Sequence, residues 1–331
     1  MTIKEVSLES EKRLVKEFLL KSDLSYEESI EKTLYMVDDN DSIIGTISKE
    51  KNVIKCFALD NNYRGEAISN TLISEMINRL YQDGINHYLV YTKRIYQDLF
   101  MSFGFNLIIN TNNVSILEYG FDTITKEIKK IRKNIEDKFD INIMDHKINS
   151  IVLNANPFTN GHMHLIEEAC KTCDYLVVFL LEEDKSFYSF KERMTLAYIS
   201  TLYLNNVIIL PSTEYIISNL TFPSYFLKEE NQRNKEWMET DVLIFKNYFM
   251  KDLNINYRYV GEETNGVMKL YNDTLKEYLG DKCIIIPRLD NISASTVRSL
   301  VKSGKIDEAI ELIPHQTKQM FRMLSIGKAN E

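Results

Sequence analysis

The chain has 331 residues, of which 44% are hydrophobic and 27% charged, and its formal net charge is −8. This length exceeds what one compact domain usually reaches, and the composition excludes disordered and fibrous proteins, so we expect two globular domains. A net negative charge does not attract the phosphate backbone of a nucleic acid, so we expect no nucleic-acid partner.

Residues 1–121 alternate between helical and strand patterns and are predicted to form one mixed α+β domain. An apolar stripe at Leu14, Phe18 and Leu19 predicts the first helix. Strands are predicted at 33–37, 43–48, 52–59 and 87–92, with a second helix at 67–80. A glycine at 104 is typical of a helix end that precedes the last strands.

A charged helical segment at 122–147 is predicted to link this domain to the rest of the chain. Its isoleucines at 124, 128, 131 and 135 form one apolar stripe. Acidic residues interrupt its lysines and arginines, so we interpret it as a connecting helix with a solvated face and not as a basic binding patch.

Residues 148–331 alternate short apolar strands with helices, which predicts a Rossmann-like, doubly wound parallel sheet covered by helices on both faces. Any ligand should then bind outside the carboxyl ends of the strands. The predicted strands are 150–155, 175–181, 207–210, 257–260 and 283–287, and the predicted helices are 161–171, 190–202, 241–249, 267–279 and 294–302.

No long apolar run or apolar signal core is present, so we expect a cytoplasmic protein with no membrane partner. The four cysteines, Cys56, Cys170, Cys173 and Cys283, are too scattered for a disulfide framework or a zinc site and are interpreted as packing residues. Five scattered histidines likewise give no reason to expect a protein-bound metal.

The first chemical motif follows the first strand of the second domain, in the sequence Asn-Ala-Asn-Pro-Phe-Thr-Asn-Gly-His at 154–162. In a strand-to-helix turn, backbone N–H groups and the helix dipole can meet a phosphate, and Gly161 permits close approach. His162 can donate a hydrogen bond to phosphoryl oxygens. Thr159, Gly161 and His162 resemble the first signature of the nucleotidyltransferase superfamily; a plain capped helix start is the alternative.

A second motif, Ile-Ser-Ala-Ser followed by Arg298, begins a helix after the fifth strand. Ser293 and Ser295 lie where N-cap groups gather, and Arg298 is one turn further on. The motif resembles the second signature of the same superfamily, in which hydroxyls and a guanidinium hold the β and γ phosphates of ATP. Helix capping alone is again the alternative.

The nucleotidyltransferase resemblance implies a catalytic role for Thr159, His162 and Arg298. It places further residues around ATP: Asn156, Phe158, Gly161, Gly261, Glu262, Ser293, Ser295 and Arg193. Gly261 and Glu262 would contact adenosine, and Arg193 would add positive charge near the phosphates, although Arg193 and Glu262 can equally be surface charges. The resemblance also implies Mg²⁺ bound mainly through phosphate oxygens.

Over nearly its whole length the chain is similar to the citrate lyase ligase family, on segments 154–159, 212–228, 271–272 and 292–295. That resemblance implies activation of acetate by ATP to acetyl-adenylate, with release of diphosphate. The acetyl group would then pass to the thiol of the phosphoribosyl-dephospho-coenzyme A group on the acyl carrier subunit of citrate lyase, with release of AMP. Acetate and the carrier are implied only by the resemblance.

The segment at 62–67 resembles the pyrophosphate loop of GNAT-type acetyltransferases, although its first position is an asparagine where that family has Gln or Arg. The resemblance implies that Arg64, Gly65 and Ala67 contact a coenzyme-A-like arm. Our hypothesis is that this domain docks the arm of the carrier subunit and does not use free acetyl-coenzyme A.

Two other functions remain open at this stage. One is an adenylyltransferase acting on a coenzyme or nicotinamide precursor, which would need no carboxylate. The other is a nucleotide-sensing or carrier-binding module that keeps the fold without turnover.

Overall fold

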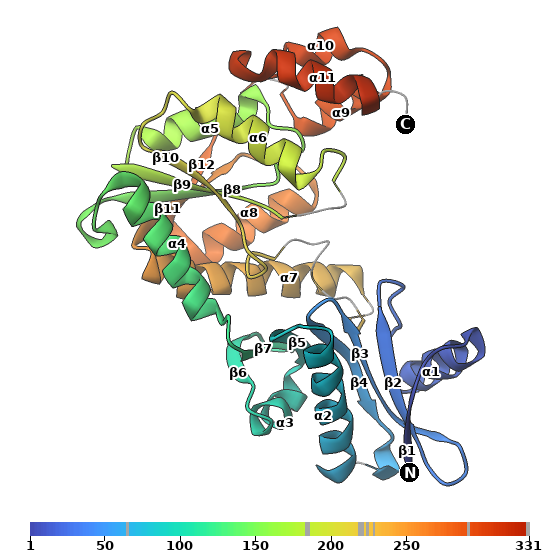
Figure 1. The fold of residues 1–331 in the computed structure, drawn as a ribbon. Coiled ribbons are helices and arrows are strands. Elements are labelled where there is room, and N and C mark those ends of the chain that lie inside the picture. The colour runs from blue at the N-terminus through green and yellow to red at the C-terminus, as the bar shows by residue number, and fades with distance from the viewer. Residues whose placement is uncertain are drawn as a thin grey trace. The chain divides into compact units, whose positions relative to one another are not determined.

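The computed structural model describes residues 1–63, 66–182, 186–217, 222, 225–227, 229–289 and 292–328. They form two compact units, one of Met1–Glu127 with Ile217–Thr240 and one of Ile128–Ile216 with Asp241–Glu331 (Figure 1). Our predicted division at 1–121, 122–147 and 148–331 is contiguous in sequence. The first unit instead includes a segment from the second half of the chain.

The first unit is a mixed α+β fold built on a seven-stranded sheet of order β1-β2-β3-β4-β5-β7-β6. Only β4 and β5 pair in parallel, and the other neighbours are antiparallel. The strands are β1 Thr2–Glu5, β2 Lys32–Val37, β3 Ile43–Glu50, β4 Val53–Leu59, β5 His87–Lys93, β6 Asn106–Asn110 and β7 Val114–Gly120, and the helices are α1 Glu9–Lys21, α2 Glu66–Gln82 and α3 Gln97–Ser102.

The core of this unit forms where the apolar face of α2 packs against the sheet. Leu72, Ile73 and Met76 are fully buried among strand residues such as Leu34 and Leu117. The predicted strands and the α2 helix are confirmed. Strand β1 was not predicted, because its residues are largely exposed and show no apolar alternation.

Helix α4, Ile124–Phe139, contains the predicted isoleucine stripe, and all four isoleucines are buried. The division between the two units falls within this helix, after Glu127. The apolar stripe therefore packs along the whole helix, as expected for a structural connecting helix.

The second unit contains five strands in the order β10-β9-β8-β11-β12, all parallel, which confirms the Rossmann-like prediction. Helices α5 and α6 cover one face and α8 the other (Figure 1). The strands are β8 Ile148–Leu153, β9 Tyr175–Leu180, β10 Val207–Pro211, β11 Ile255–Gly261 and β12 Cys283–Ile286, and the helices are α5 Asn160–Cys170, α6 Phe190–Thr201, α8 Gly266–Leu279, α9 Ala294–Lys302, α10 Ile306–Ile310 and α11 Lys318–Lys328. Helix α7, Glu230–Ile244, belongs to the first unit as far as Thr240 and to the second from Asp241 on.

The strand order reverses between β8 and β11, and in open α/β sheets such a switch point opens a crevice at the carboxyl ends of the strands. The C-terminal helices add a further layer beside this edge, because Val297, Ile313 and Phe321 are buried in one core with Phe158 and Leu196. The fold therefore places both predicted motifs at the same end of the sheet.

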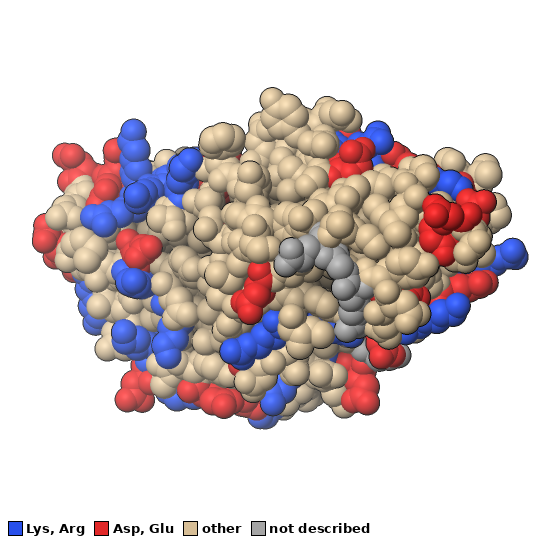
Figure 2. Space-filling model, turned by 90° about the horizontal axis from the view of Figure 1, so that it is seen from below, with Lys and Arg blue, Asp and Glu red and all other residues tan. Residues whose placement is uncertain are grey.

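Within the part of the chain that the structure describes, no helix combines the length and the apolar character needed to cross a membrane. Acidic and basic side chains occur together on the face shown in Figure 2, in keeping with the modest net charge.

Burial raises the thiol pKa of Cys170 to about 12 and that of Cys173 to about 11, which makes both poor nucleophiles.

Candidate active site

The turn between β8 and α5 is fixed from beneath by buried side chains. Phe158 is completely buried and Thr159 is 1% exposed, so two consecutive residues of the turn pack into the core. Thr159 is the N-cap of α5 and forms a capping box with His162 at the third helical position. The start of the helix is thus held in one conformation at the edge of the sheet.

His162 is oriented by its neighbour Thr159. The backbone N–H of Thr159 donates to Nδ1 of His162 at 3.0 Å, and the Thr159 hydroxyl lies 2.9 Å from the same nitrogen. The ring stacks on Phe158 with centroids 5.5 Å apart. Burial lowers the pKa of His162 to about 4, since the charged imidazolium loses hydration. The ring is therefore neutral at pH 7, and because Nδ1 accepts, its proton is on Nε2.

The structure brings the two predicted motifs into contact. A Cβ on Gly161 would lie 3.3 Å from the carbonyl oxygen of Ile292, so the helix start packs directly against the chain that leads into α9. Ser293 is the N-cap of α9, and its hydroxyl accepts from the backbone N–H of Thr296 at 3.0 Å and lies 2.8 Å from the Ser295 hydroxyl. Hydroxyl groups and the start of α9 thus lie beside the β8–α5 turn.

Arg298 links the second motif to the first. Its Nη1 donates to the carbonyl oxygen of Asn156 at 2.5 Å, and the side chain is half-buried. Burial lowers the pKa of Arg298, but an arginine remains charged at neutral pH. A guanidinium has five N–H donors, so this contact leaves Arg298 able to bind an anion as well.

Arg193 supports the end of β8, and its predicted place near the phosphates stays a prediction. The side chain is completely buried. Its Nη1 donates to the carbonyl oxygen of Asn154 at 2.6 Å and its Nε to that of Tyr188 at 3.1 Å. The backbone N–H of Tyr188 in turn donates to Oδ1 of Asn156 at 3.0 Å. Arg193 therefore joins the end of β8 to the chain before α6.

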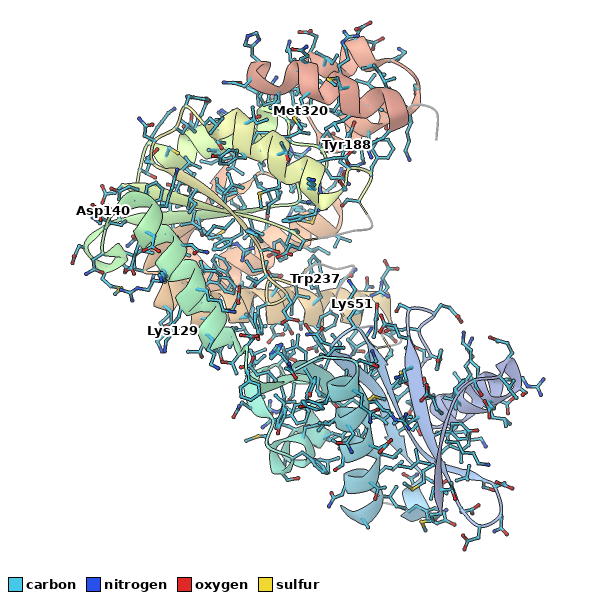
Figure 3. The ribbon with its side chains drawn as sticks, in the orientation of Figure 1. Lys51, Lys129, Asp140, Tyr188, Trp237 and Met320 are labelled. Carbon is cyan, nitrogen blue, oxygen red and sulfur yellow. The ribbon has the colours of Figure 1, made fainter. Side chains whose placement is uncertain are left out.

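Tyr188, labelled in Figure 3, extends this support to the C-terminal helices, since its hydroxyl lies 2.7 Å from that of Ser325 on α11. Asn160 adds a second link, because its backbone N–H donates to the carbonyl oxygen of Leu312 at 2.9 Å. The β8–α5 turn is therefore braced both by α6 and by the chain around α10 and α11.

The opposite side of the switch point is formed by the end of β11. Nδ2 of Asn272 donates to the Gly261 carbonyl oxygen at 2.9 Å, and a Cβ added at Gly261 would meet nothing within 4 Å among the described residues. Glu262 is exposed, and its carbonyl oxygen accepts from Nε of Arg288 at 2.8 Å. Gly261 and Glu262 are thus at the carboxyl edge, as the prediction requires, but a role with adenosine stays a prediction.

The residues predicted to contact a coenzyme-A-like arm belong to the first unit. Arg64 and Gly65 lie outside the described residues. Ala67 is exposed in the first turn of α2. Their proposed role is therefore not tested by the geometry.

Sequence reasoning assigned no role to several residues that support the site. These are Asn154, Tyr188, Asn272 and Arg288. Arg288 carried a usable signal, since it follows β12 at the carboxyl edge of the predicted sheet. The contacts of Tyr188 and Asn272 depend on tertiary packing, for which periodicity gives no sign.

Across the described residues there is no group of three or more His, Cys, Asp or Glu side chains that could hold a metal ion. The donors gathered at the edge of the sheet are hydroxyls, an imidazole and a guanidinium. Such a set suits an anion such as phosphate, and a divalent cation would have to arrive with its own anionic ligands.

Two family models match the chain. Residues 148–321 match the citrate lyase ligase C-terminal domain. Residues 3–115 match the acetyltransferase (GNAT) domain. The order of the two matches is the order that the sequence resemblances implied.

Curated relatives match almost end to end. The [citrate [pro-3S]-lyase] ligase of Escherichia coli K12 is 32% identical over 323 residues, 94% of this chain and 90% of the relative. The protein of the same name from Haemophilus influenzae is 32% identical over 332 residues, 96% of this chain and 97% of the relative. Among solved structures, a bifunctional NMN adenylyltransferase/ADP ribose pyrophosphatase from Francisella tularensis is similar at 17% identity and a TM-score of 0.35, covering 56% of this chain and 52% of its own.

Proposed function

Because the chain belongs to the citrate lyase ligase family, we propose that it is an ATP-dependent ligase that acetylates the acyl carrier subunit of citrate lyase. In the first step a carboxylate oxygen of acetate attacks the α-phosphorus of ATP. The bond from that phosphorus to the bridging oxygen breaks, and diphosphate leaves with its electron pair. The product is acetyl-adenylate, and no proton has to be moved.

In the second step the thiol of the phosphoribosyl-dephospho-coenzyme A group attacks the acetyl carbon. The carbon–oxygen bond to the phosphate of AMP breaks, AMP leaves with the electron pair, and the thiol proton is lost to solvent. A thioester, AMP and diphosphate are the final products. The enzyme's task in both steps is to position the reactants and to stabilise negative charge.

The neutral, oriented ring of His162 is the observation that carries this proposal. Its Nδ1 accepts from Thr159 at 3.0 Å, so its Nε2–H is the group left to donate to a phosphoryl oxygen. A donor fixed before the ligand arrives needs no reorganisation as charge builds at phosphorus. The lowered pKa, about 4, keeps this donor in a single protonation state at pH 7.

Ser293, Ser295 and Arg298 are proposed to hold the β and γ phosphates. Their hydroxyls and guanidinium lie at the start of α9, where the helix dipole also favours an anion. Arg298 already donates to Asn156 of the first motif at 2.5 Å, so a phosphate bound to Arg298 would be drawn toward the β8–α5 turn. Mg²⁺ enters as part of the Mg–ATP substrate, held by phosphate oxygens.

The test is exchange of labelled diphosphate into ATP, with and without acetate. We expect exchange that requires acetate and that falls about 100-fold or more in His162→Ala, the usual cost of removing one charge-stabilising donor. His164→Ala, on another face of the same helix, is the matched control and should keep wild-type exchange.

Exchange without acetate would contradict the proposal. An adenylyltransferase for a coenzyme or nicotinamide precursor would show exchange only when that precursor is supplied. If exchange is absent, deacetylated citrate lyase is added and AMP is measured. Continued absence of AMP would reject ligase activity, and ATP binding without any turnover would identify a nucleotide-sensing module.

A further inference from the structure

Asn156 lies in a turn whose backbone is strained. The residue before it, Ala155, has φ 50°, a left-handed conformation that is costly for a residue with a Cβ, and it is only 2% exposed. Arg193 donates to the carbonyl oxygen of Asn154 at 2.6 Å. Arg298 donates to that of Asn156 at 2.5 Å. A strained residue that is held by an arginine on each side indicates that the position of this turn matters for function.

The side chain of Asn156 has a defined orientation. Its Oδ1 accepts from the backbone N–H of Tyr188 at 3.0 Å. A backbone N–H can only donate, so the atom that faces it is the amide oxygen, and the NH₂ group points elsewhere. None of the described residues accepts a hydrogen bond from Nδ2, and Asn156 is only half-buried. The two N–H donors of Nδ2 are therefore available to a ligand.

The same turn carries the groups proposed to bind the phosphates of ATP. Thr159, which orients His162, is three residues further along the chain. Arg298 contacts the backbone of Asn156 itself. A small ligand that accepts from Nδ2 of Asn156 would therefore be bound next to the phosphates.

The first step of the proposed reaction needs a neutral donor at this place. Acetate and ATP are both anions, so a carboxylate of the enzyme would repel both of them. A cationic side chain would attract the phosphates as well as acetate. An amide N–H adds no net charge, and it can hold one oxygen of a carboxylate while the other oxygen stays free to react.

We propose that Nδ2 of Asn156 donates to the acetate oxygen that does not attack. The other acetate oxygen forms a bond to the α-phosphorus as the bond from phosphorus to diphosphate breaks, and diphosphate leaves with the electron pair. The oxygen held by Asn156 becomes the carbonyl oxygen of acetyl-adenylate. This assignment rests on the proposed function and gives the Asn156 side chain to the second substrate, whereas the sequence placed Asn156 around ATP.

The same amide also serves the transfer step. When the thiol attacks the acetyl carbon, negative charge builds on the carbonyl oxygen, which is the oxygen that Asn156 holds. The carbonyl group forms again when AMP leaves with its electron pair. One donor, fixed by Tyr188 before either substrate arrives, thus acts in both half-reactions.

The test is the acetate dependence of diphosphate exchange into ATP in the wild type, Asn156→Ala and Asn156→Asp. Both changes remove the donor, and aspartate keeps the acceptor for Tyr188 while adding a charge that repels acetate. We expect the KM for acetate to rise about 10- to 100-fold in Asn156→Ala and further in Asn156→Asp. ATP affinity, measured by calorimetric titration without acetate, should stay at the wild-type value in Asn156→Ala. Asn205→Asp, which adds the same charge at an exposed position before β10, should match the wild type in both measurements.

An unchanged KM for acetate in both Asn156 variants would overturn this inference. A loss of ATP affinity in both variants as large as the rise in KM would overturn it too, because Asn156 would then support the whole site and not acetate in particular. Asn156→Asp keeps the hydrogen bond to Tyr188, so it reports on the donor even if the alanine variant is unstable. Failure of the proposed function is a different result, since exchange in the wild type would then not require acetate or would be absent.

Discussion

Side chains donate to backbone carbonyl oxygens just after β8 in the second unit and on β5 in the first, and these side chains come from different parts of the chain. At β8 the carbonyl oxygens of Asn154 and Asn156 accept from Arg193 and Arg298. On β5 the carbonyl oxygen of Tyr91 accepts from the Tyr225 hydroxyl.

The difference is where the completing group lies. Arg193 lies in the core beneath the β8–α5 turn and can stay in place when a ligand arrives. Tyr225 comes from the segment Ile217–Thr240, far along the chain from the strand that it contacts. The turn after β8 is thus supported by a buried side chain of its own unit, whereas the sheet of the first unit is completed by a segment from the second half of the chain.

The largest effect on stability is expected from replacing Arg193, and this substitution tests the comparison most directly. Arg193→Met leaves the buried carbonyl group of Tyr188 and the partly buried one of Asn154 without the Arg193 donor, which should cost about 3 kcal/mol in the free energy of unfolding. Urea denaturation followed by far-ultraviolet circular dichroism measures it. Lys191→Met, an exposed position on the same helix, is the control. Similar stability of the two variants would show that Arg193 does not support the turn.

A smaller effect is expected from Glu236→Ala in the first unit. The change removes the hydrogen bonds that the buried carboxylate accepts from Thr111 and Asn113 and should cost about 2 kcal/mol. Trp237 is the one tryptophan of the chain and lies in this unit, so its fluorescence reports the transition selectively. Exposed Lys235→Ala is the control. If the fluorescence transition does not move, the segment around α7 is not what completes the first unit.

The smallest effect concerns pH. The His162 pKa is lowered from 6.5 to about 4 by folding, so the unfolded chain binds more protons between these values. The stability associated with a neutral His162 is fully present above pH 6.5 and is lost as pH falls toward 4. Between pH 7 and pH 5 the wild type should therefore lose more stability in urea than His162→Gln does. An identical loss in both proteins would mean that His162 is not held neutral.

The sequence predicted most of the second unit because its strands are apolar on both faces and its helices keep a regular stripe. The two motifs were predicted to meet because both follow strands at one edge of a sheet, and the contact of Gly161 with Ile292 agrees with that placement. Whether Thr159, His162, Ser293 and the other candidate residues bind ATP stays a prediction.

Helix α7 shows why other features were missed. Its predicted start was residue 241, whereas the helix begins at Glu230. Asn234, Glu236 and Thr240 are buried although they are polar. The buried positions of this helix therefore do not coincide with a repeating pattern of apolar residues. The burial of Arg193 was not predicted for the same reason, since an arginine in a sequence gives no sign of being completely buried. Such positions are determined by distant partners, which one sequence does not reveal.

The interleaving of Ile217–Thr240 with the first unit has a consequence for synthesis of the chain. Strands β1 to β7 leave the ribosome first, but Tyr225, Glu236 and Trp237 follow only after β8, β9 and β10 have been made. The unit that is translated first is therefore completed late, and until then the carbonyl oxygen of Tyr91 lacks its hydrogen bond from Tyr225. A protein truncated after α4 would keep that incomplete state permanently.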